Sequence, residues 1–222
     1  MTLSLVVVGV VLAVGVGRHV ANQRRRAAIA ARASAREWAH LAEDPSLVGH
    51  FPGPPFDQGH DREVTSVVRG RYDGRDLLAF DHTYETVSGT ASDQTSTTHR
   101  HSVVALSLGT DFPSLSVAPA GLLSRMFTSF HAADLEVGDP DFDEAFRVSA
   151  AHEEFARDVL VPEVRAALVG RPGLSWRIEG DQVLAIREGH HLADEIEPTA
   201  QAIQSIIAAI PDRVWARVRG DG

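Results

Sequence analysis

The sequence predicts an α+β protein that begins with a transmembrane helix. An apolar run opens the chain and arginines follow it, turn residues separate segments rich in β-branched and aromatic residues, and apolar residues near the end recur at helical spacing. These observations predict an N-terminal transmembrane helix with a basic stem, a mostly antiparallel β-meander with inserted helices, and a C-terminal amphipathic helix. The expected units are a transmembrane anchor (1–21), a juxtamembrane basic helix (22–44), a Pro/Gly-rich connector (45–60) and an α+β globular domain (61–222).

The apolar run, residues 3–17, is short for a membrane span. Its roughly 15 residues make about 22 Å of α-helix, whereas a span takes about 20 residues, so the flanking residues must contribute. Four arginines, Arg18, Arg24, Arg25 and Arg26, follow the run. By the positive-inside rule they place the C-terminal domain in the cytoplasm, where their side chains are expected to contact the surface of the lipid bilayer. A secreted domain released by signal-peptide cleavage stays open as an alternative, although no basic residue precedes the apolar run.

Small residues form a stripe on the expected anchor. Gly9, Ala13 and Gly17 recur every four residues, a spacing that lets two helices approach closely. The pattern predicts a homo-oligomer through this stripe, set against the plain alternative that glycine and alanine are common in membrane helices.

Composition excludes several kinds of chemistry. The 222 residues include no cysteine, and all 21 basic residues are arginine. Disulfides, thiolate metal sites, P-loop lysines and Schiff-base lysines are therefore absent. Residues 1–36 hold six arginines and no acid, so residues 37–222 hold the other 15 arginines and all 30 acids, a net charge near −15. A domain this acidic is a poor partner for nucleic acid.

The first half of the chain predicts a helix, an irregular connector and a meander. Residues 18–43 lack Gly and Pro and are expected to be helical, and in the connector Phe51 and Phe56 are expected to anchor on the domain. Trp38 is expected to pack on the domain, with the groove of a partner as the alternative. Strands are expected at 63–72 and 75–87, joined by Asp73-Gly74, and at 99–108 and 114–117, with a polar loop at 89–98.

The second half predicts further helices and a second hairpin. The expected elements are a helix at 121–130, an acidic segment at 136–144, a strand at 145–149, a helix at 150–160 capped by Ser149, a helix from Pro162 to Gly170, a hairpin of 174–179 with 182–187 around Gly180-Asp181, and a last helix from Pro198 to Pro211.

Short motifs resemble those of a known group of proteins. They are Gly70-Arg71, residues 80–84 (FDHTY), residues 142–148 (FDEAFRV) and residues 160–162 (LVP). Together with the apolar start and basic stem, they resemble actinobacterial-like single-pass membrane proteins that carry a domain of unknown function. The resemblance implies no activity.

One set of side chains suggests a metal site. His99 and His101 are two residues apart on an expected strand and so point to one face, and a hairpin that pairs Glu85 with His101 would bring a carboxylate to that face. Zinc takes histidine and carboxylate ligands. The alternative is a solvated polar face without metal, and no other cofactor is implied.

Three further groups are weaker candidates. His190-His191 with Asp194 and Glu195 precedes the last helix, where acids are expected because they favour the helix dipole. His82 is more typical of a satisfied core histidine than of a catalyst. Residues 139–143 are similar to the start of a calcium loop, but Glu144 stands where glycine is needed, so we interpret them as an acidic loop with Phe142 and Phe146 turned inward.

Two functions follow from these observations. The first is a non-catalytic binding or scaffolding module at the inner membrane face, with an unidentified protein or lipid partner. The second is a membrane-bound metal-dependent hydrolase that uses His99, His101 and Glu85. A concave pocket that encloses these three side chains would favour the hydrolase, and their separation would reject it.

Overall fold

The computed structural model describes residues 2–90, 93–120, 135–171 and 173–220, with side chains from Gly17 onward except that of Arg18. The helix expected at 121–130 lies outside the described residues. In chain order the elements are α1 (Thr2–Ala35), β1 (Ala39–Glu43), the 3-10 helix η1 (Pro45–Leu47), β2 (His60–Tyr72), β3 (Arg75–Thr90), β4 (Asp93–Pro119), α3 (Pro140–Ala145), β5 (Phe146–Ala150), α4 (Glu153–Val159), α5 (Pro162–Val169), β6 (Ser175–Glu188), α6 (Ile196–Ala209) and α7 (Asp212–Arg219).

The described strands form one six-stranded antiparallel sheet around β4. Strands β1, β2, β3 and β4 pair in succession, and β4 also pairs with β6 along its other edge. The last residues of β4, which β3 no longer reaches, pair with β5. The predicted α+β class with antiparallel pairing is confirmed.

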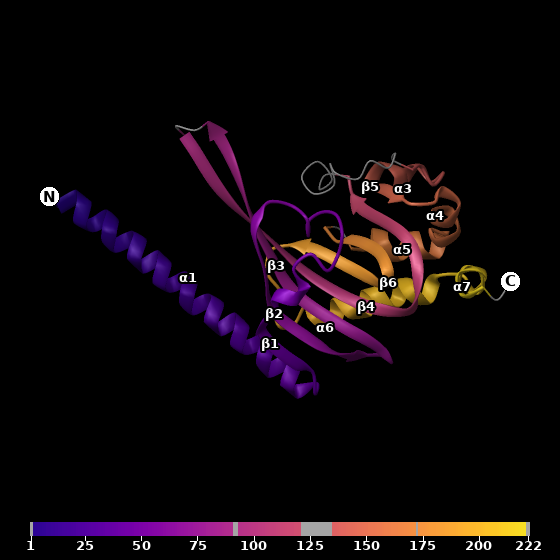
Figure 1. Ribbon diagram of the computed structural model, residues 1–222, viewed down its shortest axis with the longest axis horizontal. Coiled ribbons are helices and arrows are strands. Elements are labelled where there is room, and N and C mark those ends of the chain that lie inside the picture. The colour runs from indigo at the N-terminus through magenta and orange to yellow at the C-terminus, as the bar shows by residue number, and fades with distance from the viewer. Residues whose placement is uncertain (1, 91–92, 121–134, 172, 221–222) are drawn as a thin grey trace.

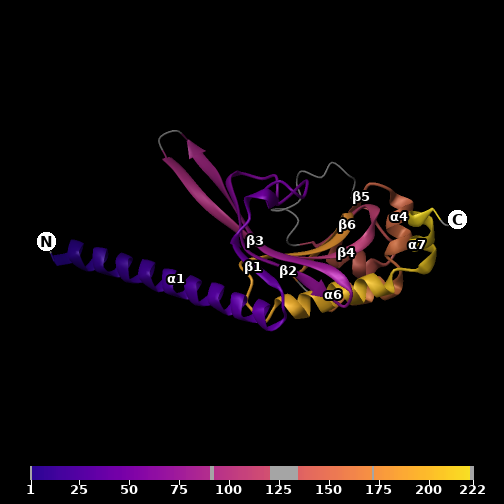
Figure 2. The same ribbon diagram turned by 60° about the horizontal axis from the view of Figure 1, so that its bottom comes forward.

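The sheet lies between two unlike layers (Figures 1 and 2). One face carries α6 and the C-terminal part of α1, and its core includes Ile29, Val104 and Ile203. The connector covers the opposite face, where the expected anchors Phe51 and Phe56 are both buried against Phe80. The connector therefore contributes aromatic side chains to the apolar core on this face of the sheet, as the sequence predicted.

The prediction of a transmembrane helix at residues 1–21 is wrong. Over the part of the chain that the structure describes, no helix combines the length and the apolarity needed to cross a membrane. The physical reason is the length of the apolar run, because about 15 residues make roughly 22 Å of helix against a hydrocarbon core of about 30 Å. Instead, α1 continues without a break to Ala35, and its C-terminal part docks on the sheet while its N-terminal part extends away (Figure 1).

The helix expected to reach residue 43 ends earlier. After α1 ends at Ala35, residues 39–43 turn back as β1 and pair with the edge of β2. Trp38 lies at this corner, partly buried against the core, and its Nε1–H donates to the carbonyl of Arg71 at 3.1 Å. The indole fits because residue 70 is glycine, since a Cβ there would lie 2.1 Å from Cδ1 of Trp38.

Of the three connections predicted between strands, one is confirmed and two are wrong. The Asp73-Gly74 hairpin is confirmed, with both residues at positive φ as a type I′ turn requires. Within the loop expected at 89–98, residues 89, 90 and 93–98 instead form a paired extension of β3 and β4, rich in threonine, which favours strands. The hairpin expected around Gly180-Asp181 does not form: β6 runs through these residues because both of its halves pair with the same long strand β4.

The helical segments follow the sequence more closely. The predicted α5 and α6 are confirmed, and Phe142 and Phe146 are buried and stacked on each other as expected. Ser149 does not cap a helix, because it is part of β5, where it pairs with Ser116 of β4. The helix α4 begins only at Glu153. The sequence did not predict α7.

Replacing Gly70 by alanine should test how tightly the corner after α1 docks. The new methyl group overlaps the indole of Trp38, so we expect the free energy of unfolding to fall by about 1–3 kcal/mol and the fluorescence of the folded protein to change. Denaturant unfolding of Gly170→Ala is the matched control, because a Cβ at Gly170 meets nothing within 4 Å. Equal stability of the two variants would contradict the close packing.

Candidate functional site

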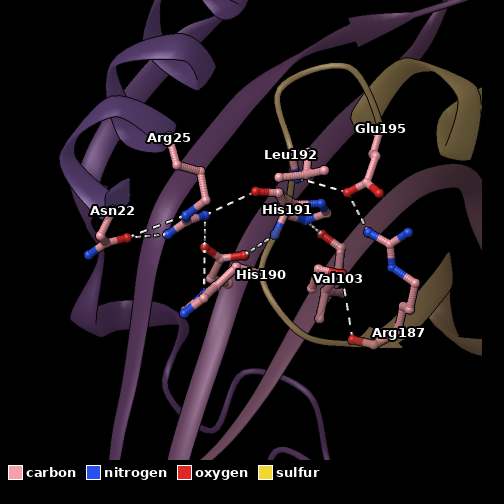
Figure 3. A network of polar contacts seen from close by, with 10 residues as sticks. Asn22, Arg25, Val103, Arg187, His190, His191, Leu192 and Glu195 are labelled. Atoms are coloured by element: carbon pink, nitrogen blue, oxygen red, sulfur yellow. Dashed lines mark hydrogen bonds and ion pairs between the residues drawn. The ribbon is translucent and has the colours of Figure 1, made fainter. Parts of the chain in front are cut away.

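A buried carboxylate, Asp81 in the middle of β3, is the centre of the main polar network, and Figure 3 shows its partners Arg25, His190 and His191. Its side chain has no exposed surface. The Nη1 group of Arg25 donates to Oδ2 at 2.6 Å, and Nδ1–H of His190 donates to the same oxygen at 3.2 Å. The backbone N–H of His191 donates to Oδ1 at 2.8 Å. Both carboxylate oxygens are thus occupied by donors from two distant segments.

The sheet and the loop after β6 position these donors. Gly189, at positive φ, donates its N–H to the carbonyl of Arg100 at 2.9 Å and turns the chain out of β6. His191 is then buried, and its Nε2–H donates to the carbonyl of Val103 at 2.9 Å. These bonds hold the backbone of the loop against β4, where the N–H of His191 donates to Asp81.

The helix α1 supplies the cation from the other side. Arg25 lies one turn before Ile29 and two turns before Ala33, both buried in the core. Its Nε and Nη2 groups donate to Oδ1 of Asn22, and Nη1 also donates to the carbonyl of His191 at 3.1 Å. The guanidinium is therefore held on both edges, and it joins α1 to the sheet and to the loop (Figure 3).

These contacts fix the charge of Asp81. Burial alone raises the pKa of its carboxyl, but the hydrogen bond from His190, the N–H of His191 and the Arg25 guanidinium outweigh burial and leave the pKa below its usual value. Asp81 is thus an ionised group with donors on both of its oxygens. A general base must be accessible to its substrate and needs a pKa near the working pH, whereas Asp81 has no exposed surface and a lowered pKa.

A second ion pair closes the same loop on its other side. Glu195 and Arg187 are paired, and Glu195 also accepts the N–H of Leu192 at 2.8 Å. The hydrogen bond from Arg187 and that from Leu192 keep the pKa of Glu195 below its usual value, against the effect of burial. The group His190-His191 with Glu195, considered above as a second metal candidate, therefore braces the loop between Asp81 and Arg187.

The three residues expected to bind a metal do not converge. Glu85 lies opposite Thr98, and His101 lies opposite His82, three residues away from Glu85, so the carboxylate and the imidazole point to opposite faces of the sheet. Glu85 accepts hydrogen bonds from Ser96 and Thr98 instead. No group of three histidine, aspartate or glutamate side chains suited to a metal ion occurs within the described ranges.

His99 and His101 belong instead to a row of rings beneath the connector. Tyr84 stacks on both of them, with ring centroids 4.7 and 5.8 Å apart, and also contacts His82. Nε2–H of His82 donates to the carbonyl of Pro55 in the connector at 3.2 Å. Burial, with His82 and His99 nearby, lowers the pKa of His101 to about 4, and burial lowers the pKa of His82 as well. At neutral pH these two histidines are uncharged core residues, as expected for His82.

A cleft of about 730 Å³, which we call the α1 cleft, opens beside the Arg25–Asp81 pair. It separates α1 from the loop after β6 and from the edge of β4. Its lining residues are His19, Ala21, Asn22, Arg25, Arg100, His190 and Leu192. The cleft is the place where the network around Asp81 meets solvent.

The other arginines of the stem differ in their surroundings. Arg24 is exposed and Arg26 is half-buried, whereas the side chain of Arg18 lies outside the described residues. Arg32 and Arg36 both pair with Glu197 on α6. The basic stem thus serves in part to attach α1 to the domain, and contact of the arginines with a membrane surface stays a prediction.

Sequence reasoning missed Asp81 and Arg25 as partners. One signal was present: Ile29 is the largest aliphatic residue between Val20 and Leu41, and a helix that buries Ile29 also turns Arg25 and Ala33 toward the domain. No signal in the sequence distinguishes Asp81 from other strand acids, because its donors lie 56 and 110 residues away.

The sequence matches no protein-family model and no curated protein. The fold is similar to the crystal structure of the mycobacterial trehalose monomycolate transport factor A, TtfA, with a TM-score of 0.60. The match covers 85% of this chain and 95% of that chain at 14% sequence identity. At this identity the likeness extends to the fold alone, and the resemblance to single-pass membrane proteins stays a prediction.

Replacing Asp81 by asparagine should destabilise the fold strongly, because it leaves the Arg25 guanidinium, whose side chain is 12% exposed, without its anion. We expect a loss of about 3 kcal/mol in the free energy of unfolding, measured with denaturant. The control Asp76→Asn removes an 82% exposed carboxylate and should change stability by less than about 0.5 kcal/mol. In a double-mutant cycle, Arg25→Gln should cost far less when Asp81 is already replaced; additive losses would show that the two residues are not coupled.

Acid should weaken the fold through His101. The folded chain holds this imidazole neutral down to pH about 4, whereas the unfolded chain protonates it below about 6.5. The unfolded state therefore binds more protons in this window, and the free energy of unfolding should fall by about 3 kcal/mol as pH drops from about 6.5 to about 4.

The variant His101→Gln isolates this contribution. It should flatten the pH dependence of the denaturation midpoint between about pH 6.5 and 4. His60→Gln, which changes a histidine outside the buried row, is the control. A wild-type slope that survives in His101→Gln would assign the acid sensitivity to another group.

Proposed function

We propose that this chain is a non-catalytic binding module with a role in transport. The observation that carries the proposal is the state of Asp81, because its side chain has no exposed surface and its two oxygens already accept from Arg25, His190 and His191, so a substrate cannot reach the carboxylate. The most chemically distinctive cluster of the described chain thus holds the structure together. What it offers to a ligand is a rigid surface and an adjoining cleft.

The similar fold supports the transport part of the proposal. TtfA is a trehalose monomycolate transport factor by name, and the alignment spans nearly all of that chain. We therefore propose that the present chain assists the movement of a lipid-linked sugar, by binding a component of the process rather than by changing it chemically.

The hydrolase alternative has no comparable support. Glu85 faces away from His99 and His101, and its oxygens are bonded to Ser96 and Thr98. His101 is buried, with a pKa of about 4, so it is a weak base shielded from solvent. A metal-dependent hydrolysis would need ligands that converge and a position open to water.

Deletion of the gene in the organism that encodes the chain tests both parts of the proposal. We expect newly made, radiolabelled glycolipids to reach the cell exterior more slowly while their synthesis continues. Complementation with the variant Glu85→Gln/His99→Gln should restore transport fully, because neither side chain has a catalytic role. Asp81→Asn, which disturbs the docking of α1, should restore it poorly.

Protein levels of each variant, compared by immunoblot, separate loss of the protein from loss of function. Normal glycolipid export in the deletion strain would contradict the transport role. Failure of Glu85→Gln/His99→Gln at a normal protein level would contradict the non-catalytic role.

A further inference from the structure

The α1 cleft is lined by basic side chains and by no acidic one. Two arginines and two histidines face it, and none of its lining residues is an aspartate or glutamate. The carboxylate of Asp81, which accepts from the lining residues Arg25 and His190, has no exposed surface. In a chain with a formal net charge of −9, an acid-free cleft of this size is an unusual surface.

Arg100 is the arginine of the cleft whose guanidinium is available to bind a ligand. It lies on β4, is exposed, and among the described residues its guanidinium has no hydrogen-bond or ion-pair partner. Its own backbone is fixed, because its carbonyl accepts the N–H of Gly189. A guanidinium presents a planar fork of donors that matches the oxygens of a carboxylate or a phosphate.

The neighbouring polar groups are oriented to assist. Oδ1 of Asn22 is bonded to Arg25, so the amide NH₂ of Asn22 keeps its donors for another acceptor. His190 is anchored through Nδ1 to Asp81, which leaves its Nε2 edge for the cleft. Arg25 already uses four of its five N–H donors within the protein and contributes as a fixed positive wall behind the site.

The cleft also has an apolar side. Leu192, which lines it, is 52% exposed, and exposed large hydrophobic side chains are few on the described surface. An apolar chain attached to an anion would cover Leu192.

We infer that the α1 cleft binds an oxyanion head group that carries an alkyl chain, with Arg100 as the main ligand of the anion and Leu192 as a contact of the chain. The inference goes beyond the proposed function, since it names a ligand class, and it stands whether or not the chain acts in transport. Fatty acids and alkyl or lipid phosphates share this chemistry.

Isothermal titration calorimetry on the full chain tests the inference with three probes: inorganic phosphate, hexyl phosphate and 1-hexanol. We expect hexyl phosphate to bind about tenfold more tightly than inorganic phosphate, because part of its chain is buried, and 1-hexanol to show no measurable binding. Equal affinity for the two phosphates, or binding of 1-hexanol as tight as that of hexyl phosphate, would overturn the inference.

Matched variants locate the binding. Arg100→Gln should weaken hexyl phosphate about tenfold or more, whereas Arg24→Gln, which removes the same charge from an exposed position on α1 outside the lining, should not. Leu192→Gln should reduce hexyl phosphate to the affinity of inorganic phosphate, and Val169→Gln, a comparably exposed position on α5, should leave it unchanged. All four positions are exposed, so the variants should fold. Loss in the controls, or none in Arg100→Gln, would place binding elsewhere.

Discussion

The ion pair between Arg25 and Asp81 is the contact on which the arrangement of this protein depends. A carboxylate with no exposed surface has lost its hydration, and such a loss is tolerated only where donors replace the water. Here the donors come from α1 and from the loop after β6, two segments that share no secondary structure with β3. The charge on one strand residue therefore fixes the positions of two others.

The consequences extend along α1. Apolar contacts of Ile29 and Ala33 are non-directional and would allow the helix to rotate or slide on the sheet. The Arg25 guanidinium, bonded to Asp81 and to the carbonyl of His191, permits one rotation, and the pairing of Arg32 and Arg36 with Glu197 repeats the constraint two turns later. The same bonds place Trp38 at the corner where only glycine leaves room for its ring.

Local signals in the sequence were reliable where the structure is local. Asp73-Gly74 makes its turn within four residues, and α6 buries a face that its own periodicity shows. Gly180-Asp181 also consists of residues that favour turns, but it does not reverse the chain. The strand β4 is long enough to pair with the residues of β6 before and after Gly180-Asp181. Residues 39–43 are helix-compatible by composition, yet the open edge of β2 recruits them as a strand. In both places a distant partner outweighed local preference, and one sequence does not reveal the partner. The buried network is the extreme case: its residue types were visible in the chain, but the contacts span 56 to 110 residues.

The same burial that builds the fold also decides what chemistry the surface can offer. Asp81 and His191 have their polar atoms turned inward, and His101 is neutral because charging it inside the protein is unfavourable. Groups in this state cannot exchange protons with a substrate at neutral pH, so the strongest polar cluster contributes rigidity.

Neutralisation of Arg25 by Asp81 then leaves Arg100 as an uncompensated cation at the edge of that rigid cluster. A single exposed arginine on a flexible surface would lose entropy when it grips an anion, whereas one whose backbone is tied to Gly189, beside a fixed asparagine and histidine, loses less. Selective binding at the α1 cleft is thus a direct consequence of how the interior is held together.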